Sequence, residues 1–380
     1  MLLVAAAIAL AWANSPWEAS YHALWQMGLT LPGPGHDTGL RPDLHFLIND
    51  GLMTLFFFVV GLEVRRELHD GTLADRRQAT LPLIAALGGV LLPAAIYALW
   101  SQDPAALPGW AVPTATDIAF AVGVLALLGN RVPPGLRILL LAVAIIDDIA
   151  AILIIAFVYS DGVGLLGLGI SAGGILGVLL LQRLGVWRPL VYVLPAGVIW
   201  LGLLQAGMHP VVGGVIVGLL TRAVPNPAPG PREDPRAPVV WLQERLHGWS
   251  TFLVMPLFAL ANAGVSIAGN PLGADLARNV FTGVLLGLVL GKPVGILAAS
   301  WLAERLGLIT LPAGVTWPGF AVLGCLAGIG FTMSIFIGGL AFDEGALLDA
   351  VKLGVLAASS VAGVLGLALG AMFLRTGARA

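Results

Sequence analysis

The sequence has few charged residues for its length. Lysine, arginine, aspartate and glutamate make up 11% of the 380 residues, less than half of the roughly 25% that is usual in soluble domains. Apolar residues make up 58%, and the mean hydropathy is +0.94. A water-soluble chain of this length could not bury so much apolar surface. The composition therefore predicts an integral membrane protein and excludes soluble enzyme folds.

The sequence also has a single cysteine and a net charge close to zero. The only cysteine, Cys325, excludes an internal disulfide and a cysteine-built metal site, and it fits a small residue in a packed helix. The formal net charge of −2 gives no sign of nucleic-acid binding. No P-loop sequence is present, which disfavours nucleotide-driven pumping. We therefore expect neither a cofactor nor an enzymatic reaction.

Long runs without charge dominate the chain. About 20 apolar residues cross a bilayer as a helix, and these runs do not alternate polar and apolar residues as barrel strands do. The fold class predicted is an all-α membrane protein with about twelve transmembrane helices. The first is interpreted as a membrane helix rather than a cleaved signal, because no basic residue precedes it. The predicted spans are 2–14, 44–63, 79–100, 108–128, 136–159, 163–181, 189–205, 208–221, 247–268, 280–303, 318–341 and 349–373.

The basic residues give this helix count an orientation. With the amino terminus in the cytoplasm, only Arg41, Arg278 and Lys352 of the 19 basic residues fall in outside loops. Lys292 lies within a span, and the others fall in inside loops or the carboxyl-terminal tail, as the positive-inside rule requires. The proline-rich segment 222–242 is predicted to be a cytoplasmic linker. Residues 1–380 then form one transmembrane domain, with both termini in the cytoplasm.

Five ionisable residues fall inside predicted spans: Asp50, Asp117, Asp147, Asp148 and Lys292. A charge at the bilayer centre costs roughly 2.5–3.5 kcal/mol on insertion scales. We therefore expect these side chains to face the protein interior and to meet partners, water or ions.

Asp147 and Asp148 are consecutive in one long helix, where neighbouring side chains point about 100° apart. Two poorly solvated carboxylates this close resist being ionised together, so the pair can exchange protons near neutral pH. When ionised, their oxygens suit Na⁺ or Li⁺, and proton and cation would compete for one site. Lys292 lies too deep to reach the interface, and we expect it to pair with Asp147 or Asp148.

Two spans contain helix-breaking sequences. Pro113, Thr114 and Thr116 interrupt the span that holds Asp117, and Gly328, Gly330 and Thr332 lie at mid-depth in the span near the carboxyl terminus. Interrupted spans in both halves of a chain indicate a transporter of inverted repeats with crossing half-helices. Asp117 would then face positive helix ends, and Lys292 negative ones. Asp50 is either a helix cap or a functional residue.

Other membrane functions fit less well. An intramembrane aspartyl protease needs two aspartates on different helices, and the sequences around Asp117 and Asp147 lack its usual contexts. A channel fits less well because the sequence contains no loop that resembles a selectivity filter. A Na⁺-coupled symporter of an organic solute remains the alternative, but it should offer more polar residues at mid-depth than this mostly acidic set.

Six segments in order resemble the NhaA-type Na⁺/H⁺ antiporters over nearly the whole chain. They are NDGLMTLFFFVVGLEVRRE (Asn49–Glu67), TATDIAFA (Thr114–Ala121), AIIDDI (Ala144–Ile149), MPLFALANAGV (Met255–Val265), GKPVGI (Gly291–Ile296) and GIGFTMSIFIGGLAF (Gly328–Phe342).

This resemblance implies electrogenic exchange, with more than one proton for each Na⁺ (or Li⁺), in a homodimer of the bacterial inner membrane that serves sodium and pH homeostasis. Asp148 would be the primary cation ligand and Asp147 the residue that binds a proton or Lys292, with Thr116 and Asp117 beside them at a broken helix. The loop 29–43 would form the dimer hairpin. The moving core would comprise 79–159 and 280–373, and the scaffold and dimer surface 1–78 and 160–279.

The resemblance also implies a cytoplasmic group linked to activation by pH, formed by Glu63, Arg66 and Glu67 and extended by Glu244 and His247. The sequence departs from the family around Leu242–Trp249. His247 and Trp249 match the family pattern there, whereas an acidic position and a first histidine differ.

Overall fold

The computed structural model describes residues 1–28, 43–160, 162, 164–225, 236–267, 270–312, 314–343 and 345–374. These residues form helices joined by short connections, and among them no β-strand occurs apart from an isolated bridge between Gly28 and Asp43. Most of the predicted outer loop 29–43, the middle of the linker 222–242 and the end of the tail lie outside the described residues. The structure therefore has the all-α architecture that the composition predicts.

Within the described ranges, seven helices are long and apolar enough to cross a membrane, or eight if one bent pair forms a single span. Three shorter apolar helices lie at 2–13, 189–205 and 211–220. The number of twelve spans stays a prediction. The seven long helices are Leu44–Asp70, Arg76–Trp100, Leu107–Leu127, Pro134–Phe157, Leu165–Arg183, Asp275–Arg305 and Ala346–Phe373.

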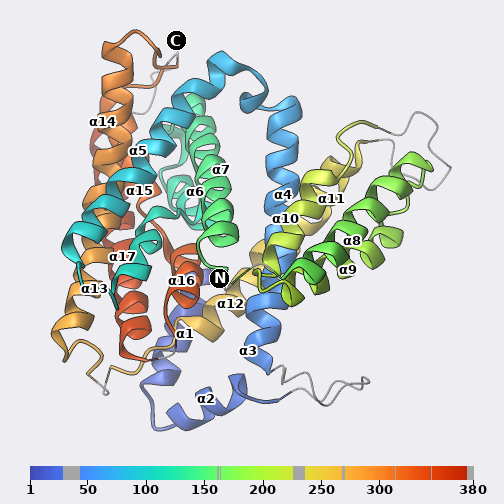
Figure 1. The fold of residues 1–380 in the computed structure, drawn as a ribbon. Helices are drawn as coiled ribbons and strands as arrows, with labels where there is room; N and C mark the ends of the chain where they lie inside the picture. The colour runs from blue at the N-terminus through green and yellow to red at the C-terminus, as the bar shows by residue number, and fades with distance from the viewer. Residues whose placement is uncertain are drawn as a thin grey trace. The chain divides into compact units, whose positions relative to one another are not determined.

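Contacts divide the chain into two units, of which the first comprises Met1–His69 and Ile155–Ala268. Within it, α8 packs along α9, and α1 packs on α12 (Figure 1). Its elements are α1 (Leu2–Ala13), α2 (Glu18–Trp25), α3 (Leu44–Phe46), the π-helical turn η1 (Leu47–Leu52), α4 (Met53–Asp70), α8 (Leu165–Arg183), η5 (Pro189–Tyr192), α9 (Val193–Gln205), α10 (Val211–Leu220), α11 (Pro238–Trp249), η6 (Ser250–Val254) and α12 (Met255–Asn262).

The second unit comprises Asp70–Ile154 and Gly269–Ala380. Here α5 packs along α14, and α17 packs on α13, α15 and α16 (Figure 1). Its elements are η2 (Thr72–Ala74), α5 (Arg76–Trp100), the 3₁₀ segment η3 (Leu107–Thr114), α6 (Ile118–Leu127), η4 (Gly129–Arg131), most of α7 (Pro134–Phe157), α13 (Asp275–Leu286), η7 (Gly287–Gly291), α14 (Lys292–Arg305), α15 (Trp317–Ala327), α16 (Phe331–Ala341) and α17 (Ala346–Phe373).

Glycines allow α5 and α14 to approach closely. A Cβ atom on Gly88 would lie 2.2 Å from the backbone oxygen of Gly295, and one on Gly295 would lie 2.1 Å from that of Gly88. Small residues at a helix interface let backbones meet, which is how helices pack without a hydrophobic driving force in lipid. This contact fixes the helix whose first residue is Lys292.

One boundary differs from the sequence prediction. Residues 238–242 were assigned to the linker, but α11 already begins at Pro238 and continues through η6 and α12 to Asn262. Proline is favoured in the first turn of a helix, because its fixed φ suits the helix and its missing N–H would have no partner there. The helix α2 was not predicted, because eight residues give a weak periodic signal.

Candidate functional site

Two helices of the second unit are interrupted where the sequence predicts it. After Pro113 the helical segment η3 ends at Thr114, and α6 begins only at Ile118. Likewise α15 ends at Ala327, and α16 begins at Phe331 with a bend of 45°. The two interruptions meet, because the Asp117 N–H donates to the Ile329 oxygen at 2.7 Å.

Glycine is required at the second interruption. A Cβ atom on Gly328 would lie 2.5 Å from the backbone oxygen of Leu288, and one on Gly330 would lie 2.1 Å from Ser334 Oγ. The backbone oxygen leaves no room for a side chain at Gly328, whereas a side chain at Gly330 would displace the Ser334 hydroxyl. The two glycines singled out in the sequence therefore allow the chain to pass close to its neighbours.

Asp117 lies fully buried between the beginnings of two helices. It caps α6 by accepting from the Phe120 N–H at 3.0 Å, and it accepts from the Thr332 N–H at 3.2 Å and from the Thr332 hydroxyl. Helix amino termini carry partial positive charge. The carboxylate thus compensates the positive ends of α6 and α16, as the sequence analysis expects.

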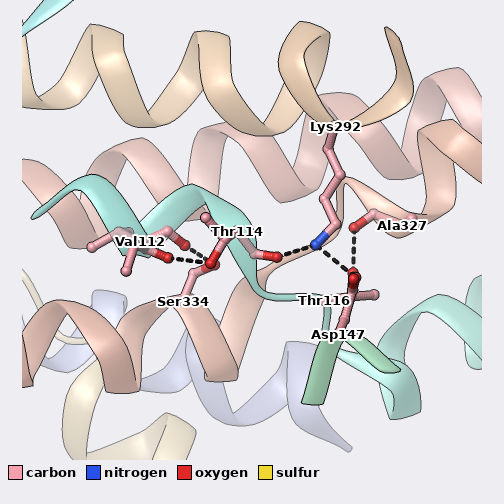
Figure 2. A network of polar contacts seen from close by, with 8 residues as sticks. Val112, Thr114, Thr116, Asp147, Lys292, Ala327 and Ser334 are labelled. Carbon is pink, nitrogen blue, oxygen red and sulfur yellow. Dashed lines mark hydrogen bonds and ion pairs between the residues drawn. The ribbon is translucent and has the colours of Figure 1, made fainter. Parts of the chain in front are cut away.

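Lys292 is fully buried and reaches the opposite kind of helix end. Its ammonium donates to the backbone oxygen of Thr114, the last residue of η3, and lies 2.8 Å from Asp147 Oδ2 (Figure 2). The predicted pairing of Lys292 with one of the two adjacent acids is therefore confirmed, and the partner is Asp147. A buried pair of this kind loses its solvation and depends on its mutual attraction and its hydrogen bonds.

The Thr116 hydroxyl stands between two acceptors. It lies 2.7 Å from Asp147 Oδ2 and 2.8 Å from the backbone oxygen of Ala327, the last residue of α15 (Figure 2). A hydroxyl has one hydrogen to donate and also accepts. It can therefore donate to an ionised Asp147, or accept from a protonated Asp147 while donating to Ala327.

Lys292 and Thr116 both contact the Oδ2 atom of Asp147 and leave its other carboxylate oxygen available for a ligand. Its Oδ1 atom is buried and has no hydrogen-bond partner among the described residues. Asp148, the next residue of α7, is 2% exposed, and its charge also acts on Lys292. Two acids and one ammonium leave the ionised set one negative charge in excess, so that a single cation or proton would balance it.

The described part of the chain holds no group of three or more histidine, cysteine, aspartate or glutamate side chains placed to bind a metal ion. The contacts described above place carboxylate, hydroxyl and backbone oxygens around the ammonium. Hard cations take oxygen ligands of this kind.

Sequence reasoning missed two buried serines that hold the interrupted helices. Ser334 donates to the Val112 oxygen at 2.8 Å (Figure 2), and Ser359 of α17 accepts from the Phe331 N–H at 3.1 Å. Serine is common in membrane helices and usually bonds within its own helix. Only the spatial neighbourhood distinguishes these two.

Asp50 belongs to the first unit and does not cap a helix. Asp43 does so, because its side chain accepts from the Phe46 N–H, whereas Asp50 lies inside η1. Asp50 Oδ1 lies 3.6 Å from His209 Nδ1. The capping alternative raised from the sequence is therefore wrong, and the residue has an ionisable partner.

The residues assigned to activation by pH lie on two helices of the first unit. Glu63, Arg66 and Glu67 lie on α4, and Glu244 and His247 lie on α11. The two helices are joined by the Arg66 guanidinium, which donates to the Gln243 side chain at 3.2 Å, while Glu244 pairs with Arg236. His247 is exposed. The contact joins α4 to α11, and the role of these residues in the response to pH stays a prediction.

Comparison with known proteins gives matches over almost the whole chain. Residues 1–369 match the family described as Na⁺/H⁺ antiporter 1. The protein named Na(+)/H(+) antiporter NhaA of Acidovorax sp. strain JS42 is 58% identical over 374 residues, which cover 97% of this chain and 88% of that relative.

Two further relatives align with a similar share of the chain, at lower sequence identity. The proteins named Na(+)/H(+) antiporter NhaA 2 of Sorangium cellulosum and of Pseudomonas putida KT2440 are 50% and 49% identical. The alignments cover 99% and 100% of this chain, and 87% and 91% of the relatives.

Proposed function

We propose that this chain, which belongs to the Na⁺/H⁺ antiporter 1 family, exchanges Na⁺ for protons across a membrane. The observation that carries the proposal is the fully buried Lys292–Asp147 pair beside Asp148, at the meeting point of two interrupted helices. A symporter of an organic solute, the alternative from the sequence, is not favoured, because the relatives over the whole chain bear antiporter names.

The exchange follows from charge balance at the site. With Asp147 and Asp148 ionised, Lys292 balances only one of them, and the excess charge attracts a cation to the unoccupied Oδ1 of Asp147 and to Asp148. Binding of Na⁺ loosens the Lys292–Asp147 pair, because one carboxylate then serves two cations. Protons that neutralise the acids expel Na⁺. Protons and Na⁺ thus compete for the same carboxylates, and the two cannot both bind fully at the same time.

The finer features belong to the same proposal. The protein would export Na⁺ or Li⁺ electrogenically, as a homodimer with twelve spans and cytoplasmic termini in the bacterial inner membrane. Its spans would form inverted repeats with crossing half-helices at 107–127 and 317–341. The segments 79–159 and 280–373 would carry the ion, and 1–78 and 160–279 would serve as scaffold and dimer surface. Surplus positive charge in the predicted inside loops supports the orientation.

Reconstituted transport tests this function directly. Purified protein in proteoliposomes with an internal pH-sensitive dye is exposed to Na⁺, Li⁺ or K⁺ across a range of pH. We expect Na⁺ and Li⁺ to drive proton movement. Asp148→Asn should abolish the signal although the protein still inserts, whereas Asp343→Asn, at an exposed aspartate of the same unit, should retain it. Robust Na⁺ flux driven by a pH gradient in Asp148→Asn would contradict the proposal.

A further inference from the structure

The beginning of α16 lacks a cap of its own. The residue before the helix, Gly330, has no side chain to accept hydrogen bonds from the first turn. The first N–H groups of any α-helix have no partner within the helix, and in a buried helix an unsatisfied N–H is costly. The acceptors for these groups in α16 must therefore come from elsewhere in the chain.

Two acceptors from distant parts of the sequence meet this need. Asp117 accepts from the Thr332 N–H, and Ser359 accepts from the Phe331 N–H at 3.1 Å. Ser359 is 3% exposed and lies in the middle of α17, which packs against both α15 and α16. The serine hydroxyl thus ties α17 to the first residue of α16, immediately after the interruption.

A short path of contacts leads from this hydroxyl to the ion pair. Phe331 is followed by Thr332, whose backbone and hydroxyl both donate to Asp117. Asp117 follows Thr116, and the Thr116 hydroxyl lies 2.7 Å from Asp147 Oδ2. The Asp117 N–H also donates to the Ile329 oxygen, within the interruption that precedes α16. A shift of Phe331 would therefore displace groups that contact Asp147, and not only the end of a helix.

We propose that Ser359 is a positioning residue for the cation site: by holding the Phe331 N–H it fixes the beginning of α16 against Asp117, and through Asp117 and Thr116 it sets the geometry of the Asp147 carboxylate. The inference rests on the proposed function, because it assumes that Asp147 and Asp148 hold Na⁺. Ser359 itself touches neither the ammonium nor the two acids in the contacts described above, and acts through the backbone of α16.

The neighbouring serine supplies a matched control. Ser360 also lies on α17, but it is exposed, and its hydroxyl donates to the Leu356 oxygen of its own helix at 2.8 Å. Ser359→Ala and Ser360→Ala remove the same atom from adjacent positions of one helix. Ser359→Thr retains the hydroxyl and serves as the rescue variant.

The experiment measures Na⁺ binding to purified protein with radioactive sodium, and antiport in proteoliposomes, for the wild type and the three variants. For Ser359→Ala we expect the Na⁺ concentration for half-maximal binding and exchange to rise roughly fivefold, the ratio that corresponds to the net free energy of one neutral hydrogen bond. The rate at saturating Na⁺ should change less than about twofold on the same reasoning, since the ligands remain. Ser359→Thr and Ser360→Ala should both behave as the wild type.

Several outcomes would overturn the inference. One is half-maximal binding of Na⁺ by Ser359→Ala within twofold of the wild type. Another is a lowered unfolding temperature together with a lowered maximal rate at unchanged half-maximal Na⁺, which is the signature of a purely structural hydroxyl. Equal losses in Ser359→Ala and Ser360→Ala would have the same meaning. Wild-type protein that binds Na⁺ without exchanging protons would refute the proposed antiport instead, and the binding data would still decide the role of Ser359.

Discussion

Replacing Thr116 by valine tests the competition between proton and cation at one atom. Valine has nearly the shape of threonine but no hydroxyl, and it suits the extended backbone of this segment. The change removes the hydroxyl whose oxygen lies 2.7 Å from Asp147 Oδ2 and 2.8 Å from the Ala327 oxygen. It leaves the Lys292–Asp147 pair and Asp148 in place.

The magnitude follows from the single hydrogen of the hydroxyl. In the ionised site Thr116 donates to a charged carboxylate, a bond that contributes about 1.5–3 kcal/mol. In the protonated site the hydroxyl accepts from Asp147 and donates to Ala327, two neutral hydrogen bonds worth about 0.5–1.5 kcal/mol each, or about 1–3 kcal/mol together. Valine thus disfavours the ionised, Na⁺-binding form by the difference between the two totals, on the order of 0.5 kcal/mol. This corresponds to roughly a twofold higher Na⁺ concentration for half-maximal exchange.

The assay is dye-monitored antiport in proteoliposomes, measured at several pH values. The difference between Thr116→Val and the wild type should be largest at the acid end of the active range and should shrink as the pH rises, because protons then compete less. Thr116→Ser, which retains the hydroxyl, is the control. The reasoning is refuted by a half-maximal Na⁺ concentration that is unchanged, by a loss of equal size at every pH, or by the same loss in Thr116→Ser.

Three further changes address the ion pair and the packing that holds it. Lys292→Ala leaves Asp147 buried without its counter-ion and should lower stability by about 3–5 kcal/mol and alter the pH dependence of exchange; unchanged pH dependence would refute the coupling. Combining it with Asp147→Asn should recover part of the stability in thermal unfolding, and additive losses would contradict the pairing. Gly295→Ala forces a Cβ atom to 2.1 Å from a backbone oxygen of α5, and we expect a loss of about 1–3 kcal/mol. Gly123→Ala, where the Cβ meets open space, should cost nothing measurable, and a similar loss in both variants would disprove the packing argument.

Much of the site could be predicted from the sequence because charge is expensive in lipid. Asp117, Asp147, Asp148 and Lys292 stand out in long apolar runs, and the cost of burying them requires an interior position and partners. The structure confirms that all four are buried. The interruptions could be predicted because Pro113 and Gly328 stand beside small polar residues at mid-depth of their spans. Proline alone is not sufficient, because α5 continues through Pro82 and Pro93.

The tertiary structure decided which groups meet, because hydrogen-bond partners far apart in the sequence leave no periodic signal. The sequence left the partner of Lys292 open between two adjacent acids, and in the fold the Asp147 carboxylate lies 2.8 Å from the ammonium. The sequence also gave no reason to prefer Ser359 over Ser360, since each is a serine in an apolar helix. Only the fold turns one hydroxyl towards the interruption and the other towards its own helix. Composition and local residue patterns thus determine which groups must be buried and near which residues helices are interrupted. Three-dimensional packing determines which buried donor pairs with which acceptor.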